Sequence, residues 1–501
     1  MKNGRMNDMY KQLEEAINKC NSLSQIIIEE RKVHKEEIKK LNEDFKEERK
    51  EMNSKVQILE QSSEEKDKLI EKLLNEIDRL KKIVNNNSDN SSNPPSTDIK
   101  GNKKEVSNNR EKTNKKVGGQ KGHKGASLSK QFVKEKIDNK EFKHEVINVG
   151  KKTDNYISKY VLDVEVNVIA KEYRFYQDEN GKYNVPKEFQ TDVQYGSEIK
   201  TLCAILNTQG VVAIDRLTDF VSSISHGKLN ISNGSIVNFI KELKEKSAPI
   251  ITNLQEKILN STLMYTDATN ARCNNKNVFV RNYSTETYTL LKATKTKSMK
   301  DINETGILPK YTGNLVHDHE TSIYNYGNKH AECNVHIGRY LKRNLEETEN
   351  KWSKDMRWFL NSLNEYRKRL ILKGDDKLPE EKLEKYSLIY DRLLTEGYEQ
   401  NKKIKSQYYK KEEKKLLNRM KKYKENHLMF LYDFSMPFDN NLSERELRHV
   451  KTKQKISGHF KSMDGLQGYL DIKSIIITCQ KIGKNFYEFI KSIFENTPVT
   501  V

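Results

Sequence analysis

The feature that most limits how this chain can fold is a 4-3 spacing of residues near its N-terminus. The spaced positions are Met52, Val56, Leu59, Ser63, Lys66, Ile70, Leu73, Ile77, Leu80 and Val84. A heptad seam of this kind is typical of a coiled coil, because a lone helix has nothing to cover its apolar stripe. We therefore predict that residues 1–84 form a coiled coil through which the chain self-associates. A long, solvated single helix is the alternative.

The charge of the chain favours a polyanionic partner. Its 501 residues carry 91 Lys and Arg against 72 Asp and Glu, a formal net charge of +19, which points to nucleic acid. The length exceeds what one compact core holds, so several segments with separate roles are expected. The longest apolar runs, at residues 26–28 and 475–477, are too short to span a bilayer, and the charged N-terminus does not resemble a signal peptide. We expect a cytoplasmic, nucleoid-associated protein with no membrane contact.

A basic segment of low complexity follows the coiled coil. Residues 85–130 are rich in Asn, Ser, Gly and Lys, a composition that cannot bury enough apolar surface to fold alone. We predict a disordered linker whose glycines let backbone amides and cations approach phosphates. Its candidate DNA-binding side chains are Lys115, Lys116, Lys121 and Lys124. Plain flexibility is the alternative interpretation.

Two smaller units are expected after the linker. Val164, Val166 and Val168 alternate with polar residues ahead of a turn at 178–181, so residues 131–196 are predicted to form a small β unit. From residue 197 to residue 255 the pattern is helical, and one helix is expected to start at 232–235. This helical unit would either bind DNA as a helix-turn-helix or serve as a plain connector.

Three carboxylates stand at the ends of predicted elements in the second half of the chain. Residues 263–266 form a strand-like run that ends at Asp267, and residues 313–317 lead to Asp318 in the same manner. Two strands that each deliver an aspartate suggest one shared site. Glu444 falls in the first turn of a helix whose predicted cap is Asn441 or Ser443.

Carboxylates on two strands and one helix suit a pair of Mg²⁺ or Mn²⁺ ions, hard cations that prefer oxygen ligands. Two such ions activate a water or a DNA hydroxyl and stabilise the leaving oxygen of a phosphoryl displacement. The residues alone leave this site undecided, because the chain has 72 acidic side chains and most carboxylates at element ends are caps or solvated groups.

Several sequence blocks resemble one known family. They lie at 90–98, 118–125, 266–269, 306–309, 313–319, 333–339 and 437–448. In this order they are similar to the insertion-sequence sixty-six (IS sixty-six) family of DDE-type transposases, specifically to its large transposase subunit, over most of residues 85–495. The last block carries the family's Asn-Asn-x-x-Glu motif, which places Glu444 at the motif glutamate.

The resemblance implies a mixed α/β fold with a ribonuclease-H-like catalytic domain. It assigns Asp267, Asp318 and Glu444 as the catalytic and metal-binding triad, and it rejects the neighbouring Glu446. The coiled coil, the disordered linker and a small β plus helical DNA-binding region would precede this domain.

The catalytic domain is expected to be interrupted, because the second and third carboxylates lie far apart in the sequence. Residues 256–345 and 431–501 would supply its two parts, and residues 346–430 a helical insertion. Trp352 and Trp358 in the insertion would either line DNA or pack inside the helices.

Cysteine usage argues against structural zinc and against a disulfide framework. No Cys-x-x-Cys pair occurs among Cys20, Cys203, Cys273, Cys333 and Cys479. Where the family has cysteines ahead of its helical region, this chain has Phe175 and Asp178. The unit at 131–196 is therefore predicted to be a degenerate zinc-ribbon-like unit, and no zinc is expected.

Other polar residues near the motif blocks have predicted supporting roles. Cys333 and His336 resemble half of a metal site, but no further ligands are evident nearby, so we expect them to orient the active-site helix. His336, Arg339 and Arg448 are candidates for contact with DNA phosphates. The histidines on either side of Asp318 are expected to point away from its carboxylate and to pack or support it.

These inferences combine into a transposase that binds the ends of an insertion sequence, assembles through its coiled coil and cleaves DNA with metal ions. The freed 3′-hydroxyl would then attack target DNA. The expected partners are the element's ends, target DNA, further copies of the chain and accessory proteins of the same element. The alternatives are a catalytically inactive DNA-binding protein derived from a transposase, and a nuclease without strand transfer.

Overall fold

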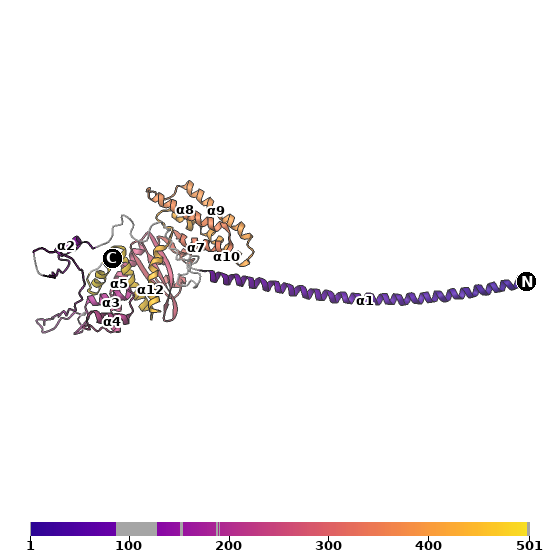
Figure 1. Ribbon diagram of the computed structural model, residues 1–501, viewed down its shortest axis with the longest axis horizontal. Helices are drawn as coiled ribbons and strands as arrows, with labels where there is room; N and C mark the ends of the chain where they lie inside the picture. The colour runs from indigo at the N-terminus through magenta and orange to yellow at the C-terminus, as the bar shows by residue number, and fades with distance from the viewer. Residues whose placement is uncertain (1, 87–127, 151–153, 187–188, 190, 498–501) are drawn as a thin grey trace. The chain divides into compact units, whose positions relative to one another are not determined.

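The protein is described by a computed structural model that covers residues 2–86, 128–150, 154–186, 189 and 191–497 (Figure 1). The chain divides into two compact units, residues 1–85 with 404–412 and residues 86–403 with 413–501. Lys115, Lys116, Lys121 and Lys124, together with most of the predicted linker, lie outside the described residues.

The N-terminal segment is one continuous helix, α1 (Lys2–Asn85), as the heptad spacing predicts (Figure 1). The side chains of the predicted seam are exposed within this unit, with Leu59 69% and Ile70 54% accessible. Self-association through this stripe remains a prediction.

Five strands form one mixed sheet in the order β3-β2-β1-β4-β5. The strands are β1 (Leu263–Cys273), β2 (Lys276–Ser284), β3 (Thr289–Thr294), β4 (Asn314–His317) and β5 (His330–Glu332). The first three pair in antiparallel fashion, whereas β4 joins β1, and β5 joins β4, in parallel. The turn between β1 and β2 consists of Asn274 and Asn275, both with positive φ, which asparagine tolerates better than most residues.

Helices account for most of the remaining described chain. They are α2 (Lys130–Asp138), α3 (Ser197–Thr208), α4 (Ile214–Ile224), α5 (Asn233–Leu259), α6 (Met299–Glu304), α7 (Asn334–Thr348), α8 (Lys351–Ile371), α9 (Glu380–Lys402), α10 (Gln407–Lys422), α11 (Lys424–Tyr432), α12 (Asn441–Ser457), α13 (Met463–Lys481) and α14 (Phe486–Phe494), with short 3-10 turns η3 (Leu308–Lys310) and η4 (Ile323–Asn325). Ser232 caps α5 by accepting a hydrogen bond from the Ser235 backbone at 3.1 Å, which confirms the predicted helix start.

The two faces of the sheet are covered by different helices. Successive side chains of a strand point to opposite faces, and Met264 packs into a core with residues of α5, α13 and α14. Its neighbour Tyr265 packs instead with Val316 and with Leu442 of α12. The face that carries Tyr265 is therefore the face on which α12 lies.

The described residues between α2 and α3 form no strand, so the strands predicted around Val164 and Val168 are wrong. The pairing that the structure shows there is an isolated bridge between Gln177 and Tyr183, which closes the predicted turn at 178–181. Both valines are exposed. Alternation of apolar and polar residues makes a strand only where a partner strand supplies hydrogen bonds and a core covers the apolar face.

The segment predicted as a helical insertion is helical, from the end of α7 through α8, α9, α10 and α11. Trp352 is fully buried, and its Nε1 donates a hydrogen bond of 2.7 Å to Glu413 Oε1. Trp358 is 72% exposed. The first tryptophan is therefore a packing residue, and only the second presents its ring to solvent.

Candidate active site

The sheet places two of the three predicted carboxylates side by side. In the parallel pair of β1 and β4, Thr266 lies opposite His317, so the next residues along the two strands are Asp267 and Asp318. Asp267 lies two positions after Tyr265, and Asp318 lies two positions after Val316, and both of these residues pack on the α12 face. Because side chains alternate between the two faces along a strand, the side chains of Asp267 and Asp318 point to that same face.

Asp267 does not end its strand, contrary to the sequence prediction. β1 continues to Cys273 because it pairs with β2 over nine positions, including Asp267 with Asn282. Asp318 does follow the last residue of β4, as predicted. The site therefore lies where a long strand passes the end of a short one.

Glu444 reaches this site from α12, in the first turn of the helix as predicted. The residue before the helix is Asn440, instead of Asn441 or Ser443, and its side chain does not cap the helix. Asn440 Nδ2 donates to Thr266 O at 3.0 Å, and its backbone N–H donates to Cys333 Sγ at 3.3 Å. Asn440 therefore fixes the start of α12 beside Asp267. The Asn-Asn-x-x-Glu motif includes this residue, but the sequence alone does not indicate its hydrogen bonds.

His336 lies between two of the carboxylates. This buried residue in the first turn of α7 places Nδ1 2.9 Å from Asp318 Oδ1 and 3.6 Å from Glu444 Oε1. On its other side, Nε2 lies 3.1 Å from Arg339 Nη1. The structure thus brings Asp318 and Glu444 together around one imidazole.

The protonation of His336 follows from these contacts. Burial opposes a charge on the ring, but Asp318 and Cys333 raise the pKa of His336 to about 12. The Arg339 guanidinium, a pure donor, instead favours a ring without a proton on Nε2. A charged ring carries a proton on both nitrogens, whereas a neutral ring that faces Arg339 carries its one proton on Nδ1. In both forms the proton on Nδ1 faces the carboxylates of Asp318 and Glu444.

The pKa of the third carboxylate, Asp267, is shifted by its burial and by neighbouring charges. Burial and the negative charge of Asp318 raise the pKa of Asp267 to about 7, and a hydrogen bond from the Ala268 backbone at 2.6 Å opposes this rise. The positive charges of His336 and Lys297 also oppose it. Lys297, an exposed residue after β3, was not among the sequence candidates.

Several atoms of this cluster are buried without satisfied hydrogen bonds. Asp318 Oδ1, Glu444 Oε1 and His336 Nδ1 make no hydrogen bond among the described residues, despite their short separations. Unsatisfied buried oxygens cost free energy unless a donor or a cation neutralises them. The residues of the site therefore fit a divalent cation that prefers oxygen ligands.

Glu446 lies two positions after Glu444 but belongs to a different environment. Its carboxylate accepts hydrogen bonds from Asn282 Nδ2 at 2.9 Å and Thr289 Oγ1 at 3.0 Å, and it pairs with Lys481 at 2.7 Å. These partners hold it against β2 and β3.

The histidines that flank Asp318 support the strand end instead of joining the carboxylates. His317 is buried, with Nδ1 2.6 Å from Asp318 O and Nε2 3.0 Å from His330 Nδ1. His319 Nδ1 lies 3.0 Å from Glu332 Oε1.

Of the predicted DNA contacts, Arg339 lies beside the cluster, and Arg448 is exposed one turn further along α12 than Glu444.

Two family models match separate parts of the chain. The sequence model described as Transposase IS66 family matches residues 192–468, more than half of the chain. The chain belongs to the IS66 transposase family. A second model, a family of unknown function (DUF6444), matches residues 22–129, and this pairing is typical of IS66 transposases.

The IS66 match includes the whole sheet and the first turn of α12, so Asp267, Asp318 and Glu444 all lie within it. A segment of 76 residues is 36% identical to "Uncharacterized protein y4jO" of Sinorhizobium fredii, which is 15% of this chain and 24% of that protein. The chain thus spans about a quarter of this relative's length. None of the described helices of the IS66-family chain is long and apolar enough to cross a membrane.

Proposed function

We propose that this IS66-family chain is a DNA transposase that binds the ends of an insertion sequence, cleaves DNA there and joins the freed 3′ end to target DNA. The observation that carries the proposal is that the two aspartates follow paired positions of adjacent strands, and that His336 contacts both Asp318 and Glu444. Asp267 and Asp318 come from adjacent parallel strands, and Glu444 comes from the helix that covers them.

In this proposal Asp267, Asp318 and Glu444 hold Mg²⁺ or Mn²⁺, two ions in the complete site. The bound ions would activate a water or a DNA hydroxyl and stabilise the leaving oxygen of the phosphate. The unsatisfied oxygens of Asp318 and Glu444 support this assignment, as does the raised pKa of Asp267, which results from burial and from the negative charge of Asp318.

Neighbouring residues would position the carboxylates and the DNA. His336 separates Asp318 from Glu444 and fixes their orientation, and Arg339 holds the far side of its ring. Lys297, which lies between the two aspartates in the sequence, and Arg448, which follows Glu444 on α12, are exposed cations. Both would bind DNA phosphates, a contact that depends strongly on salt concentration.

The remaining parts of the chain fit supporting roles in the same proposal. The mixed sheet with helices on both faces would be a ribonuclease-H-like catalytic domain, with residues 346–430 as its helical insertion. The helices of residues 197–255 would recognise the element's ends, and the exposed seam of α1 would bind a second copy of the chain.

The test is nicking and joining of a DNA fragment that carries the element's own end, in the presence of Mg²⁺ or Mn²⁺. Asp267→Asn, Asp318→Asn and Glu444→Gln should each lower the nicking rate by at least about a hundredfold, because metal activation supplies several kcal/mol. Asp464→Asn is the matched control, since this exposed carboxylate lies at the start of α13, outside the cluster.

The outcomes separate the alternatives. Retained DNA binding with lost nicking in all three variants supports the metal triad. Nicking without joined products indicates a nuclease, and end-specific binding without nicking in the wild-type protein indicates an inactive DNA-binding protein. Nicking at the wild-type rate by any one of the three variants would refute the assignment of the metal triad.

A further inference from the structure

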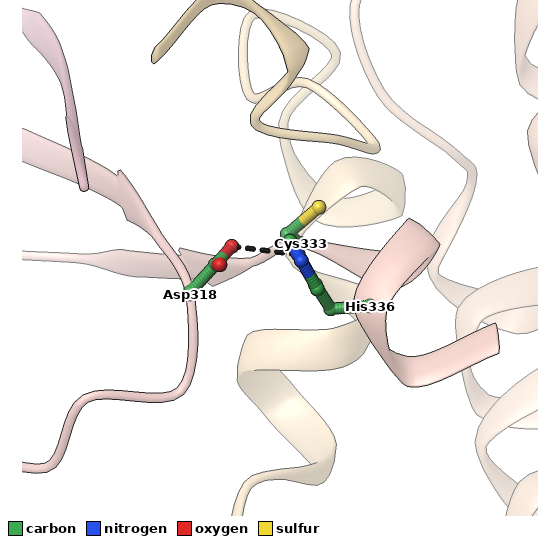
Figure 2. Close-up of side chains that lie close together, drawn as sticks. All are labelled: Asp318, Cys333 and His336. Carbon is green, nitrogen blue, oxygen red and sulfur yellow. Dashed lines mark ion pairs between the residues drawn. The ribbon is translucent and has the colours of Figure 1, made fainter. Parts of the chain in front are cut away.

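A cluster of three different ligand types overlaps the carboxylate site. Figure 2 shows the Asp318 carboxylate facing the His336 ring, with Cys333 next to that ring, and one ligand atom from each of the three residues lies within 4.8 Å of the other two. Asp318 follows β4, Cys333 is the residue before α7, and His336 lies in the first turn of that helix. The third ligand that sequence analysis did not find next to Cys333 and His336 is therefore supplied by Asp318.

The polar atoms of this cluster are placed to receive a ligand. His336 is 5% exposed and Cys333 1% exposed, and neither His336 Nδ1 nor Asp318 Oδ1 makes a hydrogen bond among the described residues. Cys333 Sγ accepts a hydrogen bond from the Asn440 backbone, an interaction that also stabilises a thiolate. A buried imidazole nitrogen beside a thiol, and 2.9 Å from a carboxylate oxygen, is an arrangement suited to a metal ion that replaces the proton between them.

The chemistry of the donors selects the kind of ion. Mg²⁺ prefers oxygen ligands alone, whereas thiolate and imidazole select Zn²⁺, Co²⁺ and Cd²⁺. Three protein ligands leave one position of a tetrahedral ion open. Glu444 Oε1 lies 3.6 Å from His336 Nδ1, close enough to fill that position, and a water molecule is the alternative fourth ligand.

We propose that Asp318, Cys333 and His336 bind a thiophilic transition-metal ion such as Zn²⁺, and that this ion excludes the catalytic cations because both sites use Asp318. Binding converts the Cys333 thiol to a thiolate and releases its proton to solvent. The binding site stands on geometry alone, whereas the inhibition rests on the proposed transposase function.

Arg339 opposes this binding. An imidazole that coordinates through Nδ1 keeps its remaining proton on Nε2, and that proton faces the Arg339 guanidinium 3.1 Å away. The arginine must therefore leave its position when the ion binds. Removing it by Arg339→Ala should tighten the affinity for the ion by about tenfold, the size of effect that groups in contact with a metal ligand exert.

The first experiment is a titration of the full-length protein with Co²⁺, followed by the near-ultraviolet absorption of a cobalt–thiolate bond. The protein carries Cys20→Ser, which removes the exposed thiol. We expect a saturable band that Cys333→Ser abolishes, that Arg339→Ala shifts to lower Co²⁺ concentration and that Zn²⁺ displaces. Cys273→Ser, a buried cysteine outside the cluster, should leave the band unchanged.

The binding proposal is overturned if the band is absent from the parent protein or persists in Cys333→Ser. Circular dichroism shows whether each variant is folded. Co²⁺ binding by His336→Gln then tests a second ligand of the same site. A folded His336→Gln protein that keeps parental Co²⁺ affinity would equally overturn the proposal.

The second experiment measures nicking in Mg²⁺ with and without Zn²⁺, each variant being compared with itself. Zn²⁺ should inhibit the parent protein, and the inhibition constant should rise at least about tenfold in Cys333→Ser. Equal inhibition of both proteins would overturn the inhibitory role. A cobalt–thiolate band in a protein that does not nick DNA would leave the metal site standing and remove the proposed transposase activity.

Discussion

The contrast between Glu444 and Glu446 gives a direct test of how α12 is used. Glu446→Ala leaves three donors, Asn282, Ser284 and Thr289, without their acceptor, and it removes the ion-pair partner of Lys481. Breaking a buried ion pair by removing one partner costs about 3–5 kcal/mol. Because 1.4 kcal/mol corresponds to a factor of ten, hydrogen-exchange protection of β2 and β3 should fall by roughly a hundredfold to a few thousandfold.

The assay is hydrogen-exchange mass spectrometry on peptides that cover β2 and β3, in the wild-type protein and in both glutamate variants. Glu444→Ala should keep the wild-type protection of these strands, since its Oε1 has no hydrogen bond to lose, while nicking is lost. Similar losses of protection in the two variants would refute the separation of roles, and so would wild-type protection in Glu446→Ala.

Further predictions concern other parts of the chain. Leu73→Glu should lower the mass in sedimentation equilibrium to that of a monomer, whereas Asn75→Glu, off the seam, should not; equal masses for the two would argue against the coiled coil. Trp352→Phe removes the hydrogen bond to Glu413 and should lower the free energy of unfolding by about 1–3 kcal/mol in urea titrations; an unchanged midpoint would contradict this. Burial and a nearby lysine lower the pKa of His449 from 6.5 to about 4, so its contribution to stability is present above pH 6.5 and is lost as the pH falls toward 4. His449→Gln should therefore lose less stability than wild type between pH 7.5 and 5, and parallel losses would show that this histidine does not contribute.

The sequence predicted those features that depend on local patterns. The run before Asp318 is a short strand, Glu444 lies in the first turn of its helix, and Ser232 caps α5. The 4-3 spacing over residues 52–84 predicted the C-terminal part of α1. In each case the residues that determine the element are neighbours in the chain.

Features that depend on distant contacts were not predictable in this way. β1 continues past Asp267 because β2 pairs with it, and a strand-like alternation at Val164 forms no strand because the described structure gives it no partner. Asn440 was missed because its bonds go to β1 and to Cys333 instead of to its own helix. The closeness of Asp318 to Cys333 and His336 was missed for the same reason, since strand pairing brings Asp318 to the start of α7.

The order in which the chain is synthesised gives the position of α12 a further consequence. The sheet is finished at Glu332, yet the anchor Asn440 and the carboxylate Glu444 emerge from the ribosome only after the whole helical segment. A chain interrupted between these points would hold two aspartates without the third carboxylate. In the proposed transposase, cleavage would therefore be withheld from incomplete translation products, which would have the strands of the site but not the group that closes it.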